Sequence, residues 1–502
     1  MVTGPRTLSI LFVLSCCGAA AAQSSAVSPQ AAAKAHSAAK AMEQGQFDQA
    51  ARIYRDLLVS MPEESGLLMN LGMALAMGGH DADAVAPLER AIALEPGLIP
   101  AQMFLGSSYL ALGRPADAIG PLKRAVAGKA SDVESRRMLA RAYAETGRPM
   151  EAAAQLRAVT DLAPALPAGW YALGHAYNAV TQDAIQGFND QPEDSPWRQL
   201  LVADAFLADG RLTDAFALQR ATLERLPSMV SIHDSIARIY ELSGHTDWAA
   251  TEKARGVLSA AACSKRRALC EFRAGRYRTA LAAAVAATDL ESRYWRARAG
   301  TELALAAFNR LDDLPDSRER REVRATLALG QRRYKDAITE LKIALKFAPQ
   351  DPGLLDDLGT AYYSAKEFEQ AVDTFTPLLT ANPDDARLLT LVGESLLELQ
   401  RPDDALPLLR RAVDRDQTDP MPRLALGRAY LQKGEFAQAV PLLEPQLRLD
   451  NDGSLHVQLA RAYSGLGQKE RAAALLQESQ NIQRAAQERG AAAGQRRIEP
   501  PK

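Results

Sequence analysis

The chain has 502 residues, of which 47% are hydrophobic and only 6% are aromatic. Alanine supplies much of the apolar content, so strong helix formers dominate, while the aromatic and β-branched residues typical of strands are sparse. The 59 basic and 61 acidic residues give a net charge of -2, which excludes a global attraction to nucleic acid. Any choice of partner must therefore come from local patches.

Residues 1–22 have the pattern of a secretory signal peptide. Arg6 precedes an apolar stretch over residues 8–17, and Ala20 and Ala22 are the small residues before a cleavage site. The stretch is shorter than the roughly 20 apolar residues of a membrane span, so an uncleaved anchor ranks lower. We therefore expect a periplasmic or secreted protein after cleavage of the signal peptide.

Four cysteines occur, and one of the two in the signal, Cys16, suggests an alternative to cleavage at Ala22. The segment that ends at Cys16 resembles an imperfect lipobox, which would make the protein lipid-anchored at that residue. Outside the signal only Cys263 and Cys270 remain, and an oxidising compartment favours a disulfide between them. Their spacing in one continuous helix would be about 10.5 Å, so a bridge requires a helix break near Ser264. Two buried, unlinked thiols are the alternative.

A short turn followed by alanine recurs along the chain. The phrase Gly-Arg-x-x-Asp/Glu-Ala occurs over residues 113–118, 147–152 and 210–215, and looser copies occur elsewhere. The closing alanines stand at positions 50, 84, 118, 152, 215, 249, 280, 337, 371, 405, 439 and 472, and most neighbours are 34 residues apart.

Each alanine is preceded by a second signal. A small residue follows an apolar one and is followed three positions later by an aromatic residue or leucine, as at Gly106 and Tyr109. Many units close on proline, such as Pro96. This pattern predicts two antiparallel amphipathic helices with glycine at the turn and proline after the second helix. Small residues such as Gly72 and Ala84 let the two helices cross closely.

These residues resemble the tetratricopeptide repeat family over roughly residues 31–480. The resemblance implies an all-α fold, a right-handed α-solenoid of about twelve helix pairs with a concave inner surface. Two steps break the rhythm, from Ala152 to Ala215 and from Ala280 to Ala337, and we interpret each as a joint with a long or extra helix. The expected organisation is a signal peptide (1–22), a linker (23–30), an N-terminal repeat block (31–164), an irregular middle block (165–315), a C-terminal block (316–482) and a disordered tail (483–502).

Patterns that carry catalytic chemistry are absent from the sequence. It has no P-loop, no G-x-S-x-G elbow, no H-E-x-x-H motif and no paired C-x-x-C motif. The nearest approach to a calcium loop is residues 450–453, Asp-Asn-Asp-Gly, which read better as a turn between repeats. The sequence therefore predicts a non-enzymatic protein without a metal site or a cofactor.

One helix in the second repeat has two apolar faces. Met69, Met73 and Met77 form a stripe at four-residue spacing, beside the leucines of the packing face. In the family's architecture these positions line the concave groove, and thioether side chains suit adaptable recognition of a peptide. The alternative is that these methionines only fill gaps in the packing between repeats. The candidate partner-binding residues are Met42, Met69, Met73, Met77, Met103, Arg137 and Arg141, where the two arginines would pair with acidic groups or a chain terminus.

A second candidate surface is basic. Few acidic residues interrupt it, and it comprises Lys265, Arg266, Arg267, Arg273, Arg276, Arg278, Arg293, Arg296 and Arg298. An anionic partner such as a membrane surface, a glycan or an acidic protein would fit it, whereas a solvated helix face is the simpler interpretation. Nucleic acid is disfavoured by export and by the lack of interleaved aromatic residues.

The first functional hypothesis is a non-catalytic scaffold that binds proteins or peptides in the bacterial cell envelope through the concave groove. The alternative is an accessory factor in polysaccharide handling or secretion, which would bind a glycan or an export-machine component through the basic middle block. The repeat specifies a surface and leaves the identity of the partner and the oligomeric state open.

Overall fold

The computed structural model describes residues 29–227, 229–494 and 496–501. The expected signal peptide, the alternative lipidation site at Cys16 and most of the expected linker lie outside these residues. Within the described ranges all regular structure is helical, and no strand occurs. None of the helices in these ranges combines the length and the apolar character that a bilayer span requires.

The chain divides into two compact units, which we describe separately. The first consists of residues up to Gly187 together with Ala274–Thr288 and Trp295–Leu314, and the second of Phe188–Arg273, Asp289–Tyr294 and the residues from Pro315 onward. The first unit contains α1 (Pro29–Glu43), α2 (Phe47–Ser60), α3 (Ser65–Met77), α4 (Asp81–Leu94), α5 (Ile99–Ala111), α6 (Pro115–Gly128), α7 (Val133–Glu145), α8 (Pro149–Leu162), α9 (Pro167–Gln186), α16 (Tyr277–Val285), most of α17 (Leu290–Asn309) and the 3-10 helix η1 (Arg310–Asp313).

The second unit begins with shorter helices and continues with a regular series of pairs. It contains α10 (Pro196–Ala208), α11 (Leu212–Arg225), α12 (Ser231–Leu242), α13 (Thr246–Arg255), α14 (Ala260–Lys265), α15 (Arg267–Arg273), α18 (Arg318–Gly330), α19 (Tyr334–Phe347), α20 (Pro352–Ser364), α21 (Phe368–Ala381), α22 (Ala386–Glu398), α23 (Pro402–Arg415), α24 (Pro420–Lys433), α25 (Phe436–Leu443), η2 (Glu444–Leu449), α26 (Ser454–Gly465) and α27 (Lys469–Gly494).

The repeated alanines all take the same place in this architecture. Each of the twelve is the fourth residue of the second helix of a pair, as Ala84 is in α4 and Ala405 in α23. All twelve are buried, and most of them are fully inaccessible to solvent. The prediction of an all-α stack of helix pairs is therefore confirmed.

The turn inside each pair uses a left-handed backbone residue. Gly113 and Gly147 occupy this position with φ of 69° and 70°, where glycine has no steric penalty. In the second unit Arg332, Lys366 and Gln400 hold the equivalent position with φ between 56° and 62°. The turn geometry is thus imposed by the packing of the pair even where the local residue disfavours it.

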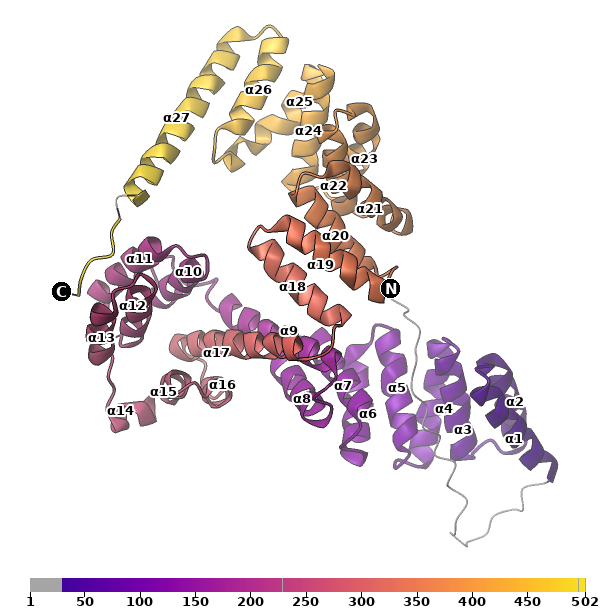
Figure 1. The fold of residues 1–502 in the computed structure, drawn as a ribbon. Helices are drawn as coiled ribbons and strands as arrows, with labels where there is room; N and C mark the ends of the chain where they lie inside the picture. The colour runs from indigo at the N-terminus through magenta and orange to yellow at the C-terminus, as the bar shows by residue number, and fades with distance from the viewer. Residues whose placement is uncertain (1–28, 228, 495, 502) are drawn as a thin grey trace. The chain divides into compact units, whose positions relative to one another are not determined.

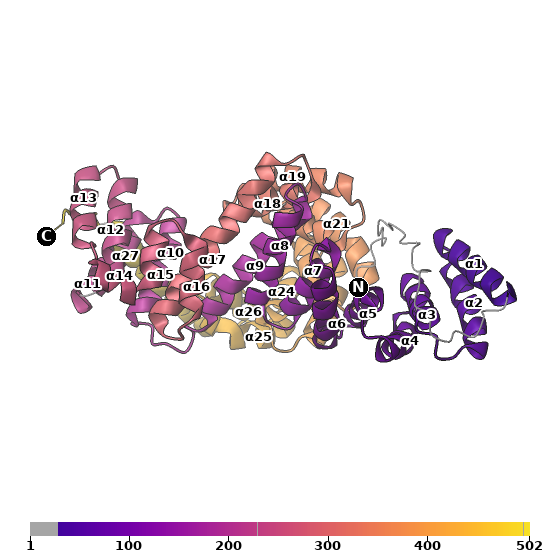
Figure 2. The same ribbon diagram turned by 90° about the horizontal axis from the view of Figure 1, so that it is seen from below.

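Close helix crossings explain the small residue in the first helix of each pair. A Cβ atom added at Gly72 in α3 would lie 2.3 Å from Cγ of Leu88 in α4, and one at Gly106 in α5 would lie 2.4 Å from Cγ of Leu122 in α6. Successive pairs stack side by side, as α1–α4 do in both views (Figures 1 and 2). The glycine therefore makes room for the leucine of its partner helix.

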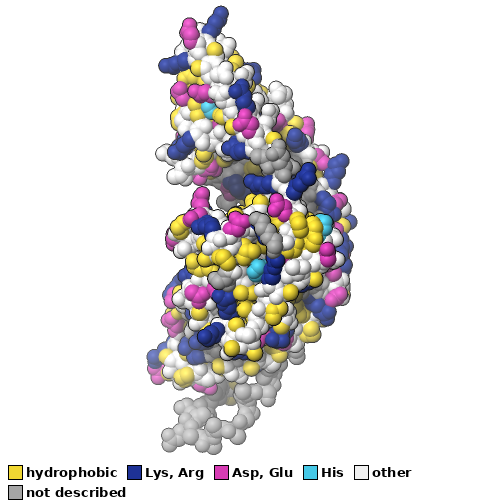
Figure 3. Space-filling view, turned by 90° about the vertical axis from the view of Figure 1, so that its left-hand side faces the viewer, with side chains coloured by type: hydrophobic (Ala, Val, Ile, Leu, Met, Phe, Trp, Pro, Cys, Tyr) yellow, Lys and Arg dark blue, Asp and Glu magenta, His cyan; other side chains and the backbone are white. Residues whose placement is uncertain are grey.

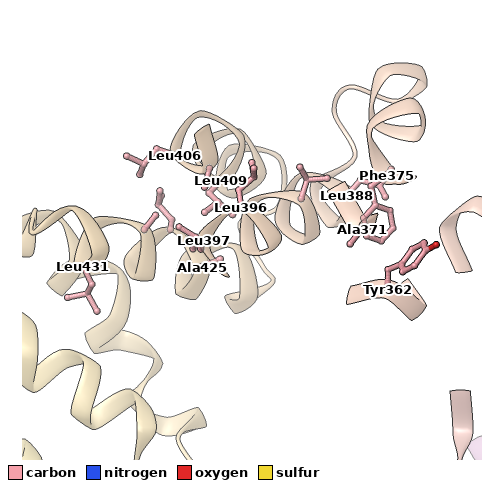
Figure 4. Packing of buried hydrophobic residues seen from close by; sticks show 14 of the residues in the cluster. Tyr362, Ala371, Phe375, Leu388, Leu396, Leu397, Leu406, Leu409, Ala425 and Leu431 are labelled. Carbon is pink, nitrogen blue, oxygen red and sulfur yellow. The ribbon is translucent and has the colours of Figure 1, made fainter. Parts of the chain in front are cut away.

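The second unit repeats this packing with an aromatic side chain. Phe375 is fully buried, and its Cε1 atom would lie 2.5 Å from a Cβ at Gly359. Figure 4 shows Phe375 beside Ala371 and near Tyr362, followed along the stack by leucines of α22 and α23. One continuous apolar core therefore runs through α18–α27.

The two expected joints are long helices that pack against each other. Helices α9 and α17 both have 20 residues. Gly174 of α9 accommodates the ring of Phe308, and Thr181 donates a hydrogen bond to the carbonyl of Ala297 (3.2 Å). Because of these contacts, Trp295–Leu314 belongs to the first unit, so the structure groups residues 165–315 differently from the expected middle block.

The expected disordered tail also differs. Helix α27 continues to Gly494, so residues 483–494 are helical. The segment is rich in alanine, glutamine, glutamate and arginine, which are strong helix formers, and a helix already running from Lys469 propagates through them at little cost. The lack of a core-forming pattern therefore did not imply a lack of helix.

Candidate functional site

The predicted methionine stripe lies on α3. Met69, Met73 and Met77 are half-buried, whereas Leu68 and Leu71 on the packing face are buried. Helix α3 contacts α5, and α5 contacts α7, so the first helices of three successive pairs form one surface. The stripe therefore stands on a surface that continues across neighbouring repeats.

A cavity of about 170 Å³ opens on this surface between α5 and α7. It brings together two of the predicted residues, Met103 and Arg141. Its other lining residues are Phe104, Ser107, Leu110, Ala111, Glu134 and Met138. The cavity can therefore accept an apolar side chain with a charged group at its rim.

Sequence reasoning missed Met138, which is half-buried and lines this cavity. The predicted residues follow the 34-residue spacing from Met69 to Met103 to Arg137. Met138 stands one position further on and corresponds to Phe104. Aligning the repeats would have indicated Met138 only if the position of Phe104 had also been assigned to the binding surface.

The two predicted arginines are already paired on their own helix. Arg137 donates to Glu134 (2.9 Å) and Arg141 donates to Glu145 (2.6 Å). Both pairs are exposed to solvent, where an ion pair contributes little stability, on the order of 1 kcal/mol or less. A ligand carboxylate could therefore replace either partner at small cost.

Met42 departs from the prediction. It is buried in α1 and corresponds in the repeat to Ala76 and Leu110, which are also buried. It stands one position before the residue equivalent to Met77 and so turns toward the core. Met42 is therefore buried among its neighbours, although the equivalent residue Leu110 lines the cavity between α5 and α7.

A larger cavity, about 360 Å³, lies in the second unit between α24 and α26. Glu394, Met421, Leu424, Arg428 and Gln458 are among its lining residues. Sequence reasoning missed this site. The alignment of the repeats could have indicated it, because Leu424 and Arg428 occupy the positions equivalent to Met69 and Met73 of the second repeat.

A polar network crosses this cavity. Tyr363 donates a hydrogen bond to Glu394 (2.8 Å), which also faces Arg428 (3.5 Å). Burial, followed by the nearby Glu394 carboxylate, raises the pKa of Tyr363. The hydroxyl therefore remains a hydrogen-bond donor at any physiological pH.

The acidic turn at residues 450–453 has a structural role in the same region. Asp450 accepts hydrogen bonds from the backbone of Gly453 (2.9 Å) and from Nδ1 of His456 (2.6 Å). Burial raises the pKa of Asp450, but the hydrogen bonds from His456 and its neighbours lower it, and the net pKa lies below its usual value. No cluster of His, Cys, Asp or Glu suited to a metal ion occurs in the described part of the chain.

The structure joins Cys263 and Cys270 in a disulfide with a Cα–Cα distance of 5.6 Å. The helix breaks between them, because α14 ends at Lys265 and α15 begins at Arg267. Ser259 caps the start of α14 by accepting from the backbone of Ala262 (3.2 Å). A break of this kind is what the sequence spacing required for a bridge.

The predicted basic surface is largely engaged within the protein. Arg273 donates to Asp234 (2.7 Å) and to the carbonyl of Gly256 (2.7 Å), and Arg296 is mostly buried near Asp183. Its residues also fall in both compact units. On the face drawn in Figure 3, lysine and arginine side chains are interspersed with acidic ones. Arg273 and Arg296 are therefore already engaged by groups of this chain.

Models of the tetratricopeptide repeat match five stretches of the chain: residues 38–99, 133–158, 357–420, 396–455 and 453–485. A peroxisomal targeting signal receptor of Candida glabrata is 28% identical over 115 residues, which are 23% of this chain and 20% of the receptor. The chain thus matches about a fifth of that relative's length.

The comparison with solved structures found chains that are similar over part of their length. MamA from Desulfovibrio magneticus RS-1 is 21% identical, with 32% of this chain and 88% of that chain aligned at a TM-score of 0.30. YrrB, described as a TPR protein with an unusual peptide-binding site, is 22% identical, with 32% and 82% aligned at 0.28. The family matches, the twelve buried alanines and the paired helices agree, and the matched stretches of the chain are tetratricopeptide repeats.

Proposed function

We propose that this chain is a non-catalytic scaffold of the bacterial cell envelope that holds an apolar peptide segment of a partner protein on the surface of α3, α5 and α7. The observation that carries the proposal is the cavity between α5 and α7, which continues the methionine stripe of α3. Membership of the tetratricopeptide repeat family supports the coarser statement, a protein-binding scaffold.

The chemistry of this surface defines the segment that would fit it. Half-buried thioethers from α3 and α5 offer a flexible apolar surface that can adapt to branched or aromatic side chains. Arg137 and Arg141 stand at the α7 end, each in an exposed and weak ion pair. The expected ligand is therefore a short segment with two or more apolar anchors and a carboxylate, from an acidic side chain or a chain terminus.

The cell-envelope location has two supports. The pattern of residues 1–22 is that of an export signal. A disulfide between Cys263 and Cys270 suits an oxidising compartment. The mass of the native N-terminus tests this part of the proposal: cleavage predicts a chain starting at Gln23, and lipid anchoring predicts a modified chain starting at Cys16.

The polysaccharide alternative would require a basic surface with accessible cations. Arg273 and Arg296 are held by contacts inside the protein, so their charge is less available to an anionic glycan. The apolar surface of the first unit carries no such restriction. We therefore place peptide binding first.

Photo-crosslinking tests the peptide site. A photoreactive residue in place of Ser107, which lines the cavity, should capture a partner in envelope fractions. The double variant Met69→Glu and Met73→Glu should lose this capture, because two charges would have to be desolvated on binding. Far-UV circular dichroism should remain unchanged.

The matched control adds the same two charges elsewhere in the first unit. Val59 on α2 and Leu94 on α4 are exposed to solvent, so the double variant Val59→Glu and Leu94→Glu should capture the partner normally. Capture that survives in the methionine variant would move the site away from α3. Loss in both variants would indicate a nonspecific effect of charge.

A further inference from the structure

In three repeats the tyrosine of the first helix forms a hydrogen bond with the preceding second helix or the 3-10 helix that follows it. Tyr109 donates to Glu89 of α4, and Tyr463 donates to Glu444 at the start of η2 (2.8 Å). At Tyr430 the direction is reversed, since Arg410 of α23 donates to its hydroxyl (3.0 Å). In each case the partner lies 19 or 20 residues earlier in the sequence.

Tyr240 of α12 holds the equivalent position but has a different partner. Its hydroxyl donates to the backbone carbonyl of Glu499 (2.6 Å), which lies 259 residues later in the chain. Tyr240 is fully buried, and its ring packs against Phe216 and Trp248 at centroid distances of 5.6 and 5.5 Å. Burial accordingly raises the pKa of Tyr240, which keeps the hydroxyl a donor.

A recurring ion pair shows the same exception. In the first turn of many second helices an arginine pairs with a carboxylate three residues later, and in four of these pairs the carboxylate side chain is between 43% and 59% exposed. Asp214 of α11 forms this pair with Arg211 (2.7 Å) but is only 14% exposed. Its second oxygen accepts from Arg496 (2.8 Å). The segment around Arg496 therefore covers a carboxylate that is open in other repeats.

We propose that the edge between α11 and α12 is a binding site for an extended segment containing arginine and proline, and that Arg496–Pro501 of this chain occupies it as an intramolecular ligand. We call this segment the latch. The guanidinium of Arg496 binds Asp214, and the carbonyl of Glu499 accepts from Tyr240. In Figures 1 and 2 the yellow end of the trace reaches the neighbourhood of α11 and α12, which belong to the same compact unit.

The composition of the latch fits such a role. Residues 496–501 have no regular secondary structure, and Pro500 and Pro501 restrict the backbone to extended conformations before binding. Ile498 is half-buried between the two polar anchors. Attachment to α27 makes binding intramolecular, so two weak polar contacts suffice to hold the segment. A partner segment with the same spacing of arginine and proline would compete for this edge.

Intramolecular photo-crosslinking tests the latch in the full chain. A photoreactive residue in place of Ile498 should form a crosslink within the same molecule to residues of α11 or α12, identified by peptide mass. The double variant Asp214→Asn and Tyr240→Phe should reduce the yield about tenfold or more, because both polar anchors are lost. Arg496→Ala should also reduce the yield, whereas Arg497→Ala, which removes the same charge from an exposed neighbour, should not.

A matched double variant controls for general effects on the repeats. Asp117→Asn and Tyr143→Phe make the same changes at the same 26-residue spacing in the first unit and should leave the yield unchanged. Thermal unfolding of both double variants should be similar to that of the unsubstituted chain. Crosslinks between two molecules would assign the segment to a second copy and overturn the proposal. Crosslinks that map elsewhere, or a yield unaffected by the Asp214 and Tyr240 changes, would overturn it as well.

Discussion

The crossing of α5 and α6 leads to a quantitative prediction for Gly106→Ala. The added Cβ would lie 2.4 Å from Cγ and 2.6 Å from Cδ2 of Leu122, far inside van der Waals contact. Leu122 is fully buried and cannot swing into solvent, so the helices or the leucine must shift. Overpacking of this kind costs about 1 to 3 kcal/mol of unfolding free energy.

The helix itself provides an opposing effect. Alanine is favoured over glycine in a helix interior by about 1 kcal/mol, which would hide part of the cost. Gly120 in α6 supplies the matched control, because the nearest atoms to a Cβ there are the Arg124 guanidinium nitrogens at 3.9 Å. Helix propensity cancels between the two variants. Gly106→Ala should therefore be less stable than Gly120→Ala by about 1 to 3 kcal/mol.

Two measurements check this difference. Urea unfolding followed by far-UV circular dichroism gives the change in stability of the chain. Hydrogen exchange read by mass spectrometry over residues 99–128 shows whether the loss is local, as expected where each repeat contacts only its neighbours. Equal stability of the two variants would refute the close crossing of α5 and α6. The repeat register deduced from Gly106 would then be wrong.

Three further predictions follow from local geometry. Gln400→Gly should raise the unfolding free energy by about 1 kcal/mol, because φ is 59° there and glycine adopts this left-handed conformation without a steric penalty. Gly434→Gln at the equivalent turn should lower the unfolding free energy for the same reason. Opposite results in urea titrations would contradict the turn geometry. Asp450 has a pKa below its usual value, so its carboxylate contributes stability that is present above the unfolded pKa and is lost as pH falls through the folded pKa; Asp450→Asn should therefore flatten the acid dependence of stability between about pH 5 and about pH 2. Reducing the bridge between Cys263 and Cys270 should cost about 2 kcal/mol locally and speed hydrogen exchange over residues 260–273, whereas labelling of both thiols before reduction would exclude the bridge.

The repeat register explains why so much of the fold could be predicted from the sequence. Buried alanines such as Ala84 and close crossings such as Gly106 on Leu122 recur with one spacing, and each copy independently reports the same helix pair. Contacts that do not repeat carry no such signal. The packing of Phe308 on Gly174 joins residues more than a hundred positions apart, and nothing in the local pattern of either helix indicates it.

The candidate sites were predictable to a lesser extent for a related reason. A stripe such as Met69, Met73 and Met77 is visible in one helix, so the sequence alone predicts one part of the proposed surface. The cavity between α5 and α7 requires side chains from two repeats, and Met138 enters it from a position that the 34-residue spacing does not mark. Met42 is the opposite case: it stands one position before the residue equivalent to Met77, and its side chain is buried. An α-helix rotates by about 100° per residue, so a register error of one position moves a side chain to another face.

Function in a repeat protein must therefore come from the positions where equivalent residues differ. The place next to the small residue of the first helix is occupied by Met73 in α3, Arg141 in α7 and Arg428 in α24, and the last two line the two cavities. The core positions remain nearly constant because every pair must bury the same crossing. Tyr240 differs from its equivalents in another way. Its residue type is the same as theirs, and only its hydrogen-bond partner is different. In both proposals the binding surface therefore lies where one repeat differs from the others, in residue type on α3 and α7 and in hydrogen-bond partner at Tyr240.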